Sequence, residues 1–293
     1  MQTTSKGWGS GLLGVVIFSG SLPATRVAVM GFSPWFLTSA RAVIAAALGL
    51  LLLGALREKR PSRSDLVSLS IVAIGVVLGF PLLTAPALQH ITSAQSSMFI
   101  GLLPLSTAVF GVLRGAERPQ PAFWLFSGLG SLAVASFALL QGGAISIEGA
   151  LLMVGAILLC GLGYAEGAAL SRRLGGWQVI SWALVLSAPV LVPVVAWRLW
   201  QHGAAAGIAA WLAFAYVSLV SMYLAFFAWY RALARGGVAR IGQIQLAQPV
   251  LTLLWAALLL GERITGAMAL AAAAVLASVA LTQRMRAAHD PRA

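Results

Sequence analysis

Long runs of apolar residues, separated by short breaks that contain charged residues, glycine or proline, extend along almost the whole chain. A helix needs about 20 apolar residues to cross the hydrocarbon layer of a membrane. The pattern therefore predicts an all-α integral membrane protein with ten transmembrane spans, numbered one to ten in chain order, at residues 8–29, 34–56, 66–87, 93–114, 121–140, 147–170, 177–199, 209–232, 241–261 and 265–284.

Basic residues are distributed unevenly over the connections between these spans. Fifteen of the 19 lysines and arginines fall on the side that holds the N-terminus, the connections after even-numbered spans and the C-terminus. Only Arg26, Arg198 and Arg263 fall on the other side, and Arg41 lies inside span two. Cytoplasmic loops carry an excess of lysine and arginine. We therefore expect both termini in the cytoplasm.

The composition agrees with a protein of the cell membrane. Hydrophobic residues make up 60% of the 293 positions and charged residues only 9%, which is far from the proportions of a soluble domain. The net charge of +12 would suggest nucleic acid as the partner of a soluble chain, but membrane orientation explains these basic residues better. The expected partners are the lipid bilayer and a small molecule, with no nucleic acid. The sequence carries no signal for an oligomeric state.

The two halves of the chain repeat each other at a constant offset. Pro104 recurs as Pro249, and the pair at 117–118 recurs as Glu262 and Arg263, in both cases 145 positions later. We interpret the chain as one permease domain, 1–293, built from repeats at about 8–140 and 147–284. Each repeat holds five spans, and an odd number places the two copies in opposite orientations. Inverted repeats are typical of membrane transporters.

The residues that carry a family resemblance are Phe32, Ser33, Pro34, Arg41, Ala87, Leu88, Pro104, Pro249, Gly261, Glu262 and Arg263. Their order resembles the drug/metabolite transporter superfamily, in particular its ten-helix EamA-type branch, over essentially the whole chain. Within the branch the chain is similar to bacterial exporters of aromatic and other neutral amino acids of the YddG kind. The resemblance implies that spans one to four and six to nine surround a central cavity, with spans five and ten outside it.

Two helices are expected to be interrupted near the middle of the membrane, where such transporters bind their substrates. Span one contains Ser19 and Gly20 shortly before a proline, and span six contains Tyr164 after two glycines. An interruption frees backbone groups that must find partners. The alternative is close helix packing through the glycine pairs at 75 and 79 and at 163 and 167.

Polar side chains form a stripe on span nine. Gln245, Gln248 and Thr252 are spaced by three and four residues, so they share one helical face. Amides are costly in hydrocarbon unless they are hydrogen-bonded. The stripe indicates either a wall of the substrate cavity or hydrogen bonding between helices.

Aromatic residues accompany this stripe. Phe80 and Thr84 lie on span three, and Tyr223 and Phe227 lie on span eight. Rings with a few polar groups suit a ligand that has an apolar body and a small polar head. Each of these aromatics could instead belong to the packed core, but together they favour an amino acid or a similar amphiphile.

Two ionisable residues lie within predicted spans. Arg41 could bind a substrate carboxylate, or it could turn towards the membrane surface or pair with Glu148 or Glu262. Glu166 could carry a proton, or it could form an ion pair with Arg172 or its neighbour. The small multidrug-resistance branch of the same superfamily carries a membrane-buried glutamate in its first helix, and the midplane of span one has no carboxylate. This departure from the related branch disfavours the export of hydrophobic cations and makes tight proton coupling doubtful.

The function that these features predict is export of small neutral metabolites, above all aromatic and other apolar amino acids, across the bacterial cytoplasmic membrane by alternating access. Alternatives are an exporter of drugs or other metabolites, or a nucleotide-sugar-type carrier, which would need several basic residues in the cavity. An enzyme would need clustered acid, base or metal-binding groups, whereas the histidines at 90, 202 and 289 lie in connections or the tail. No cofactor, metal or catalytic residue is expected.

Overall fold

The computed structural model describes residues 7–114, 146–203 and 205–270, together with the isolated positions 121, 124–125, 128–129, 132, 272–274 and 277. All regular secondary structure in this part of the chain is helical. The α-helices are α1 Trp8–Ser19, α2 Ser21–Ala28, α3 Pro34–Ala55, α4 Arg63–Val72, α5 Phe80–His90, α6 Ser93–Ile100, α7 Leu103–Leu113, α9 Ile147–Leu174, α10 Gly176–His202, α11 Ile208–Ala215, α12 Ala225–Gly236, α13 Val238–Gly242 and α14 Gln248–Leu260. Three other segments continue them, the π-helices η1 Ala73–Gly79 and η2 Tyr216–Leu224 and the 3-10 helix η3 Gln243–Ala247.

Eight helices within the described residues are long and apolar enough to cross a membrane, and they correspond to predicted spans one to four and six to nine. Predicted span five, 121–140, lies outside the described residues except for isolated positions. Of predicted span ten, the stretch 266–270 is described without gaps and is helical. The eight spans are Trp8–Ala28, Pro34–Ala55, Arg63–His90, Ser93–Leu113, Ile147–Leu174, Gly176–Gln201, Ile208–Gly236 and Arg240–Leu260.

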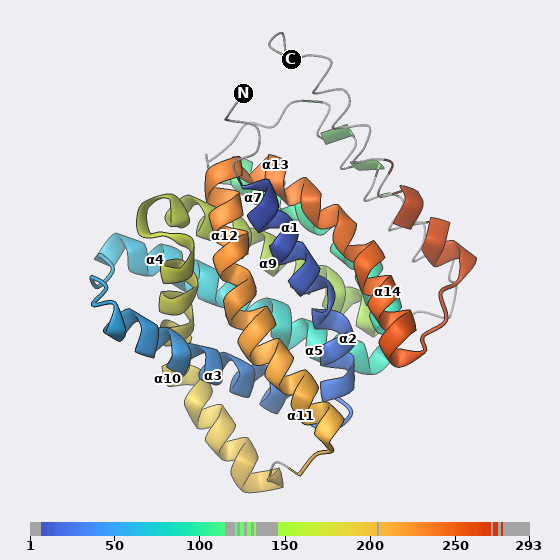
Figure 1. Cartoon of the computed structure of the whole chain (residues 1–293), viewed down its shortest axis with the longest axis horizontal. Helices are drawn as coiled ribbons and strands as arrows, with labels where there is room; N and C mark the ends of the chain where they lie inside the picture. The colour runs from blue at the N-terminus through green and yellow to red at the C-terminus, as the bar shows by residue number, and fades with distance from the viewer. Residues whose placement is uncertain are drawn as a thin grey trace.

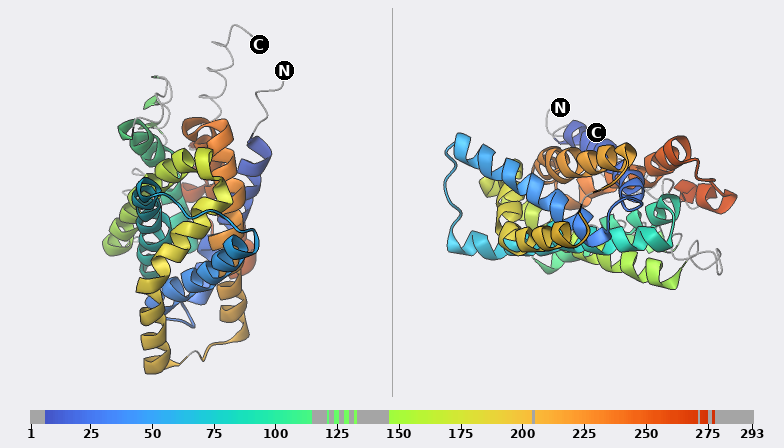
Figure 2. Two further views of the ribbon diagram at one scale, coloured as in Figure 1. Left: turned by 90° about the vertical axis from the view of Figure 1, so that its left-hand side faces the viewer. Right: turned by 90° about the horizontal axis from the view of Figure 1, so that it is seen from below.

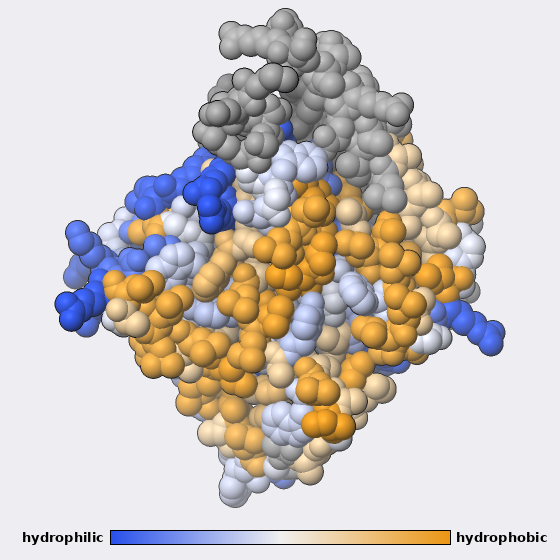
Figure 3. All heavy atoms as spheres, in the orientation of Figure 1, coloured by the Kyte–Doolittle hydropathy of each residue, from blue (hydrophilic) through white to orange (hydrophobic). Residues whose placement is uncertain are grey.

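The described helices form two layers. α1, α12 and α14 lie together in one layer, and α5, α7 and α9 lie together in the other (Figures 1 and 2). α3 and α10 pack along each other beside them. Apolar side chains cover much of the face that Figure 3 shows. Many large apolar residues are exposed, as expected of a surface in contact with lipid tails, among them Leu50, Leu51, Leu151, Val190, Leu212, Leu258 and Leu259.

Span one is interrupted, as predicted. α1 ends at Ser19 and α2 begins at Ser21, with Gly20 between them. A Cβ atom on Gly20 would lie 2.6 Å from the hydroxyl oxygen of Tyr216, so a larger residue does not fit. Tyr216 donates that hydroxyl to the carbonyl oxygen of Ile17, one turn before the break. The glycine thus allows span eight to hold the end of α1.

Span six is not interrupted, and this prediction is wrong. α9 continues from Ile147 to Leu174 through Tyr164 without a break. The reason is that its glycines serve packing, and no proline in this stretch removes a backbone donor. A Cβ atom on Gly75 would lie 2.9 Å from the Cα atom of Gly163. Close packing of η1 against α9, the alternative explanation of these glycines, is therefore confirmed.

The irregular segments occupy corresponding places in the two halves. Moving Ala73–Gly79 along by the 145-residue offset gives 218–224, which falls within η2. The break between α6 and α7 is followed by α7, which begins at Leu103, just before Pro104. The segment η3 is followed by α14, which begins at the corresponding residue Gln248, just before Pro249. This agreement supports the predicted duplication, because π- and 3-10 segments are uncommon in helices.

Candidate functional site

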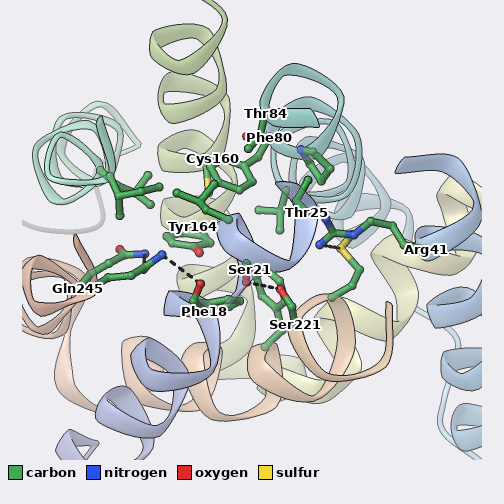
Figure 4. Close-up of a pocket in the computed structure, with 18 residues that line it drawn as sticks. Phe18, Ser21, Thr25, Arg41, Phe80, Thr84, Cys160, Tyr164, Ser221 and Gln245 are labelled. Carbon is green, nitrogen blue, oxygen red and sulfur yellow. Dashed lines mark hydrogen bonds between the residues drawn. The ribbon is translucent and has the colours of Figure 1, made fainter. Parts of the chain in front are cut away.

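A cavity of about 40 Å³ lies between the two layers of helices. Its aromatic walls come from Phe18, Phe80, Tyr164 and Phe226 (Figure 4). Its polar groups are Ser21, Thr25, Arg41, Thr84, Ser221, Gln245 and Gln248. The volume is enough for a few water-sized molecules.

Every interruption of the helices described above contributes to this cavity. Phe18 and Ser21 flank the break in span one, and Ile100 and Leu103 flank the break in span four. The segments η1, η2 and η3 contribute Val76, Ser221, Met222 and Gln245. Irregular backbone at membrane depth is tolerated only where protein buries it or where it lines a cavity. The convergence of five irregular segments on one cavity therefore identifies this cavity as the candidate site.

The break in span one is held by the polar stripe of span nine. Thr252 donates its hydroxyl to the carbonyl oxygen of Ser19 at 2.8 Å, and the indole of Trp255 donates to the hydroxyl of Ser19 at 3.0 Å. Gln248 donates its amide to the carbonyl oxygen of Phe18 at 3.5 Å. Ser19, Gly20 and Thr252 are not among the lining residues. Thr252 of the stripe therefore bonds between helices, while its two glutamines line the cavity.

Arg41 lies in the cavity wall without an acidic partner among the described residues. Its side chain is buried, its Nη2 lies 3.5 Å from the sulfur of Met222, and its Nε has no hydrogen-bond partner. The predicted ion pairs do not form, because both candidate carboxylates are engaged elsewhere. Glu148 faces His90, and Glu262 accepts from the backbone at the start of α6. The side chain of Arg41 also does not turn towards the membrane surface, since it is buried at the cavity.

Three polar atoms on the cavity wall are buried and have no partner in the described structure. These atoms are Arg41 Nε, Thr84 Oγ1 and Gln245 Oε1. An unpartnered buried polar atom costs about 1–3 kcal/mol. Three of them around one cavity leave its wall with polar atoms that are available to a bound molecule.

The two aromatics that were predicted on span eight lie away from the cavity. Tyr223 hydrogen-bonds to Ser181 of α10 at 2.9 Å, and Phe227 packs against Tyr223 and Trp177. Phe226 lines the cavity instead. The cause is η2, because a π-helical turn contains more residues than an α-helical turn and rotates all later side chains. The sequence gives no local signal for this shift.

Residues that the sequence analysis missed also line the cavity. The hydroxyls of Ser21 and Ser221 hydrogen-bond at 2.6 Å and connect span one to span eight across the cavity wall (Figure 4). Thr25 follows Ser21 by one turn, and Cys160 precedes Tyr164 by one turn. A search for polar residues one turn after the predicted break would have found Thr25. Cys160 carried no such signal.

Glu166 lies outside the cavity and forms an ion pair, but with an unexpected partner. Arg114 donates its Nε to the carboxylate of Glu166 at 2.7 Å. The bond raises the pKa of the Arg114 guanidinium above its ordinary value. Arg173, a neighbour of Arg172 and one of the expected partners, binds Asp65 instead. The sequence could not show this, because Arg114 follows span four and is distant in the chain.

A polytopic bundle whose broken helices converge on a partly polar cavity has the architecture of a membrane transporter. Among the described residues, no group of three histidine, cysteine or acidic side chains is placed to hold a metal ion. The chain belongs to the EamA-like transporter family, whose model matches residues 5–139 and again residues 147–284. It is a multi-pass protein of the cell membrane and a transporter of the drug/metabolite superfamily, as the resemblance implied.

Two relatives and one solved structure are similar to this chain. The chain is 57% identical over 286 residues to the uncharacterized transporter YdeK of Bacillus subtilis (strain 168), covering 97% of this chain and 99% of that protein. It is 24% identical over 252 residues to a probable terminal-alkyne amino-acid exporter of Streptantibioticus cattleyicolor, covering 86% and 84% of the two chains. A crystal structure with 19% sequence identity has the same fold, with a TM-score of 0.72 over 96% of this chain and 99% of the other.

Proposed function

We propose that the protein exports small neutral amino acids and similar amphiphiles, mainly aromatic and large apolar ones, by alternating access of its two halves. Aromatic walls with a few polar groups suit a ligand that combines an apolar body with a polar head. The relative from Streptantibioticus cattleyicolor, a probable terminal-alkyne amino-acid exporter, supports the same substrate class.

The observation that carries this proposal is the state of Arg41. A buried guanidinium without a carboxylate partner is costly, and it binds carboxylates well because its donors form a planar fork. Since the described lining residues include no acidic side chain, the partner would be the carboxylate of the substrate. Thr84 and Gln245 offer unpartnered oxygens that can accept from other donors of the substrate. The carboxylate of a neutral amino acid would therefore pair with Arg41, while its ammonium group would donate hydrogen bonds to such oxygens.

Transport of such a substrate requires the helices to separate. A cavity of about 40 Å³ is smaller than a whole amino acid. Contacts join the two halves at both ends of the bundle, with Arg114 and Glu166 at the end predicted to face the cytoplasm and Glu262 on the backbone of Ser93 and Ala94 at the opposite end. In our proposal, one set of contacts opens while the other stays closed.

The test is uptake of labelled phenylalanine, tryptophan, methionine and threonine into liposomes that contain the purified protein. We expect saturable flux of at least the aromatic amino acids. Replacement of Arg41 by glutamine should raise the KM about tenfold or more, because a charge-assisted hydrogen bond contributes about 1.5–3 kcal/mol. The matched control is Arg231→Gln, since Arg231 is exposed and does not line the cavity.

Absence of flux for all four amino acids would contradict the substrate class. Equal KM values for Arg41→Gln and the wild type would remove Arg41 from the binding site. A nucleotide-sugar-type carrier is not favoured, because Arg41 is the only basic side chain among the described lining residues and phosphates require more. Drugs and other metabolites are the remaining alternatives, and competition by such compounds but not by amino acids would support them.

A further inference from the structure

The side-chain amide of Gln245 presents an unpartnered oxygen to the cavity. Gln245 is 1% exposed and lines the cavity, and its Oε1 atom has no hydrogen-bond partner. Figure 4 shows Gln245 and Arg41 on opposite sides of the cavity, with the ring of Tyr164 between them in that view. The cavity therefore has two polar ends, one cationic and one neutral.

Hydrogen bonds determine which atom of Gln245 faces the cavity. Gln248 must direct its nitrogen towards the carbonyl oxygen of Phe18, because a carbonyl accepts and does not donate. The oxygen of Gln248 then faces Gln245, which donates its own nitrogen to it at 3.3 Å. If nitrogen and oxygen were exchanged in the amide of Gln245, two oxygens would face each other. If they were exchanged in the amide of Gln248, two nitrogens would face each other, and an oxygen would face the carbonyl oxygen of Phe18. The oxygen of Gln245 is thus the atom left for a ligand.

An acceptor in this position discriminates between ligands. A ligand with an O–H or N–H group near Gln245 completes its hydrogen bonding, whereas a ligand that is apolar there keeps the oxygen buried and unpaired. Sites built to bind a hydroxyl or N–H reject the analogue that lacks it far more strongly than apolar pockets reject an extra methylene. The two ends of the cavity would therefore bind opposite ends of one substrate.

From this arrangement we infer that Gln245 is a specificity-determining residue, which selects amino acids that carry a hydrogen-bond donor at the far end of an aromatic side chain. The inference rests on the proposed function, with the carboxylate of the substrate bound at Arg41. Tyrosine, with its phenol, and tryptophan, with its indole N–H, belong to the selected class. Phenylalanine, O-methyltyrosine and 1-methyltryptophan have the same framework without the donor, and are selected against.

The experiment measures uptake by proteoliposomes of the wild type for tyrosine, O-methyltyrosine and phenylalanine. We expect kcat/KM for tyrosine to exceed those of the two donor-free analogues by about tenfold, the ratio that corresponds to one buried hydrogen bond. Replacement of Gln245 by methionine, which is similar in length and lacks the acceptor, should reduce this ratio to about one, because tyrosine loses the acceptor that favours it over the donor-free analogues.

The control is Gln243→Met. Gln243 is buried in the same segment, η3, and does not line the cavity, so the preference for tyrosine should persist in this variant. Equal transport of tyrosine, O-methyltyrosine and phenylalanine by the wild type would overturn the inference and leave the proposed function in place. Absence of transport for all three would overturn both. The comparison of tyrosine with its donor-free analogues in the wild type tests the inference even if Gln245→Met does not fold.

Discussion

Glu262 connects the two halves of the chain through a single side chain. Its carboxylate accepts from the backbone nitrogens of Ser93 at 3.2 Å and Ala94 at 2.8 Å, and from the hydroxyl of Ser93 at 2.8 Å. These groups form the first turn of α6, where backbone N–H groups have no partner within the helix and negative charge is favourable. The residue after span nine thereby fixes the start of span four.

Replacement of Glu262 by alanine should lower the free energy of unfolding by about 1–3 kcal/mol, because it leaves the first donors of α6 without their acceptor. The midpoint of thermal unfolding in detergent measures the effect. Glu148→Ala is the matched control, since the side chain of Glu148 is 69% exposed and faces only His90 at 3.7 Å. Equal midpoints for the two variants would show that the contact does not stabilise the fold.

The sequence predicted which residues line the cavity better than it predicted which residues form ion pairs with each other. Thr84, Gln245 and Gln248 were predicted at the cavity and line it, because polar residues in apolar spans are conspicuous. Arg41 also lines it, although a place in the cavity was one of three alternatives for this residue. The partners of ionisable residues could not be predicted, since they depend on contacts between distant segments. Arg114 with Glu166 is an example, as the two lie 52 positions apart.

At the scale of elements, the predicted spans of the described region agree with the structure, whereas the irregularities within them agree only in part. The break in span one was predictable, because serine, glycine and proline interrupt an apolar run. The π-segments η1 and η2 were not, since their residues carry no signal that separates a π-helical turn from an α-helical turn, and tertiary packing determines the register. The assignment of Phe227 to the cavity failed for this reason, and Phe226 occupies the place.

The break in span one offers a test of this close packing. Replacement of Gly20 by alanine should reduce transport severalfold, because the added Cβ atom would lie 2.6 Å from the hydroxyl oxygen of Tyr216. The double variant with Tyr216→Phe removes that oxygen and should recover part of the activity, although it also removes the bond to Ile17. Flux in proteoliposomes measures both, and unchanged flux in Gly20→Ala would contradict the account.

At the scale of the whole molecule, the structure combines a small cavity with contacts at both ends of the bundle. Glu166 binds Arg114 and Asp65 binds Arg173 at the end predicted to face the cytoplasm, while Glu262 holds α6 at the other. These contacts join segments from the two predicted repeats. Motion of one half against the other must therefore break contacts at one end, which agrees with alternating access.

The central claim is that this cavity is the compartment through which the substrate passes, and Cys160 allows a direct measurement. Cys160 is the only cysteine of the chain, it lines the cavity, and it is 2% exposed. Alkylation of the wild type in proteoliposomes by a small maleimide should be slow, and a transported amino acid should slow it further, with half-protection near its KM. Cys160→Ser serves as the unlabelled control. Alkylation that stays at the same rate under saturating transported substrate would contradict the account.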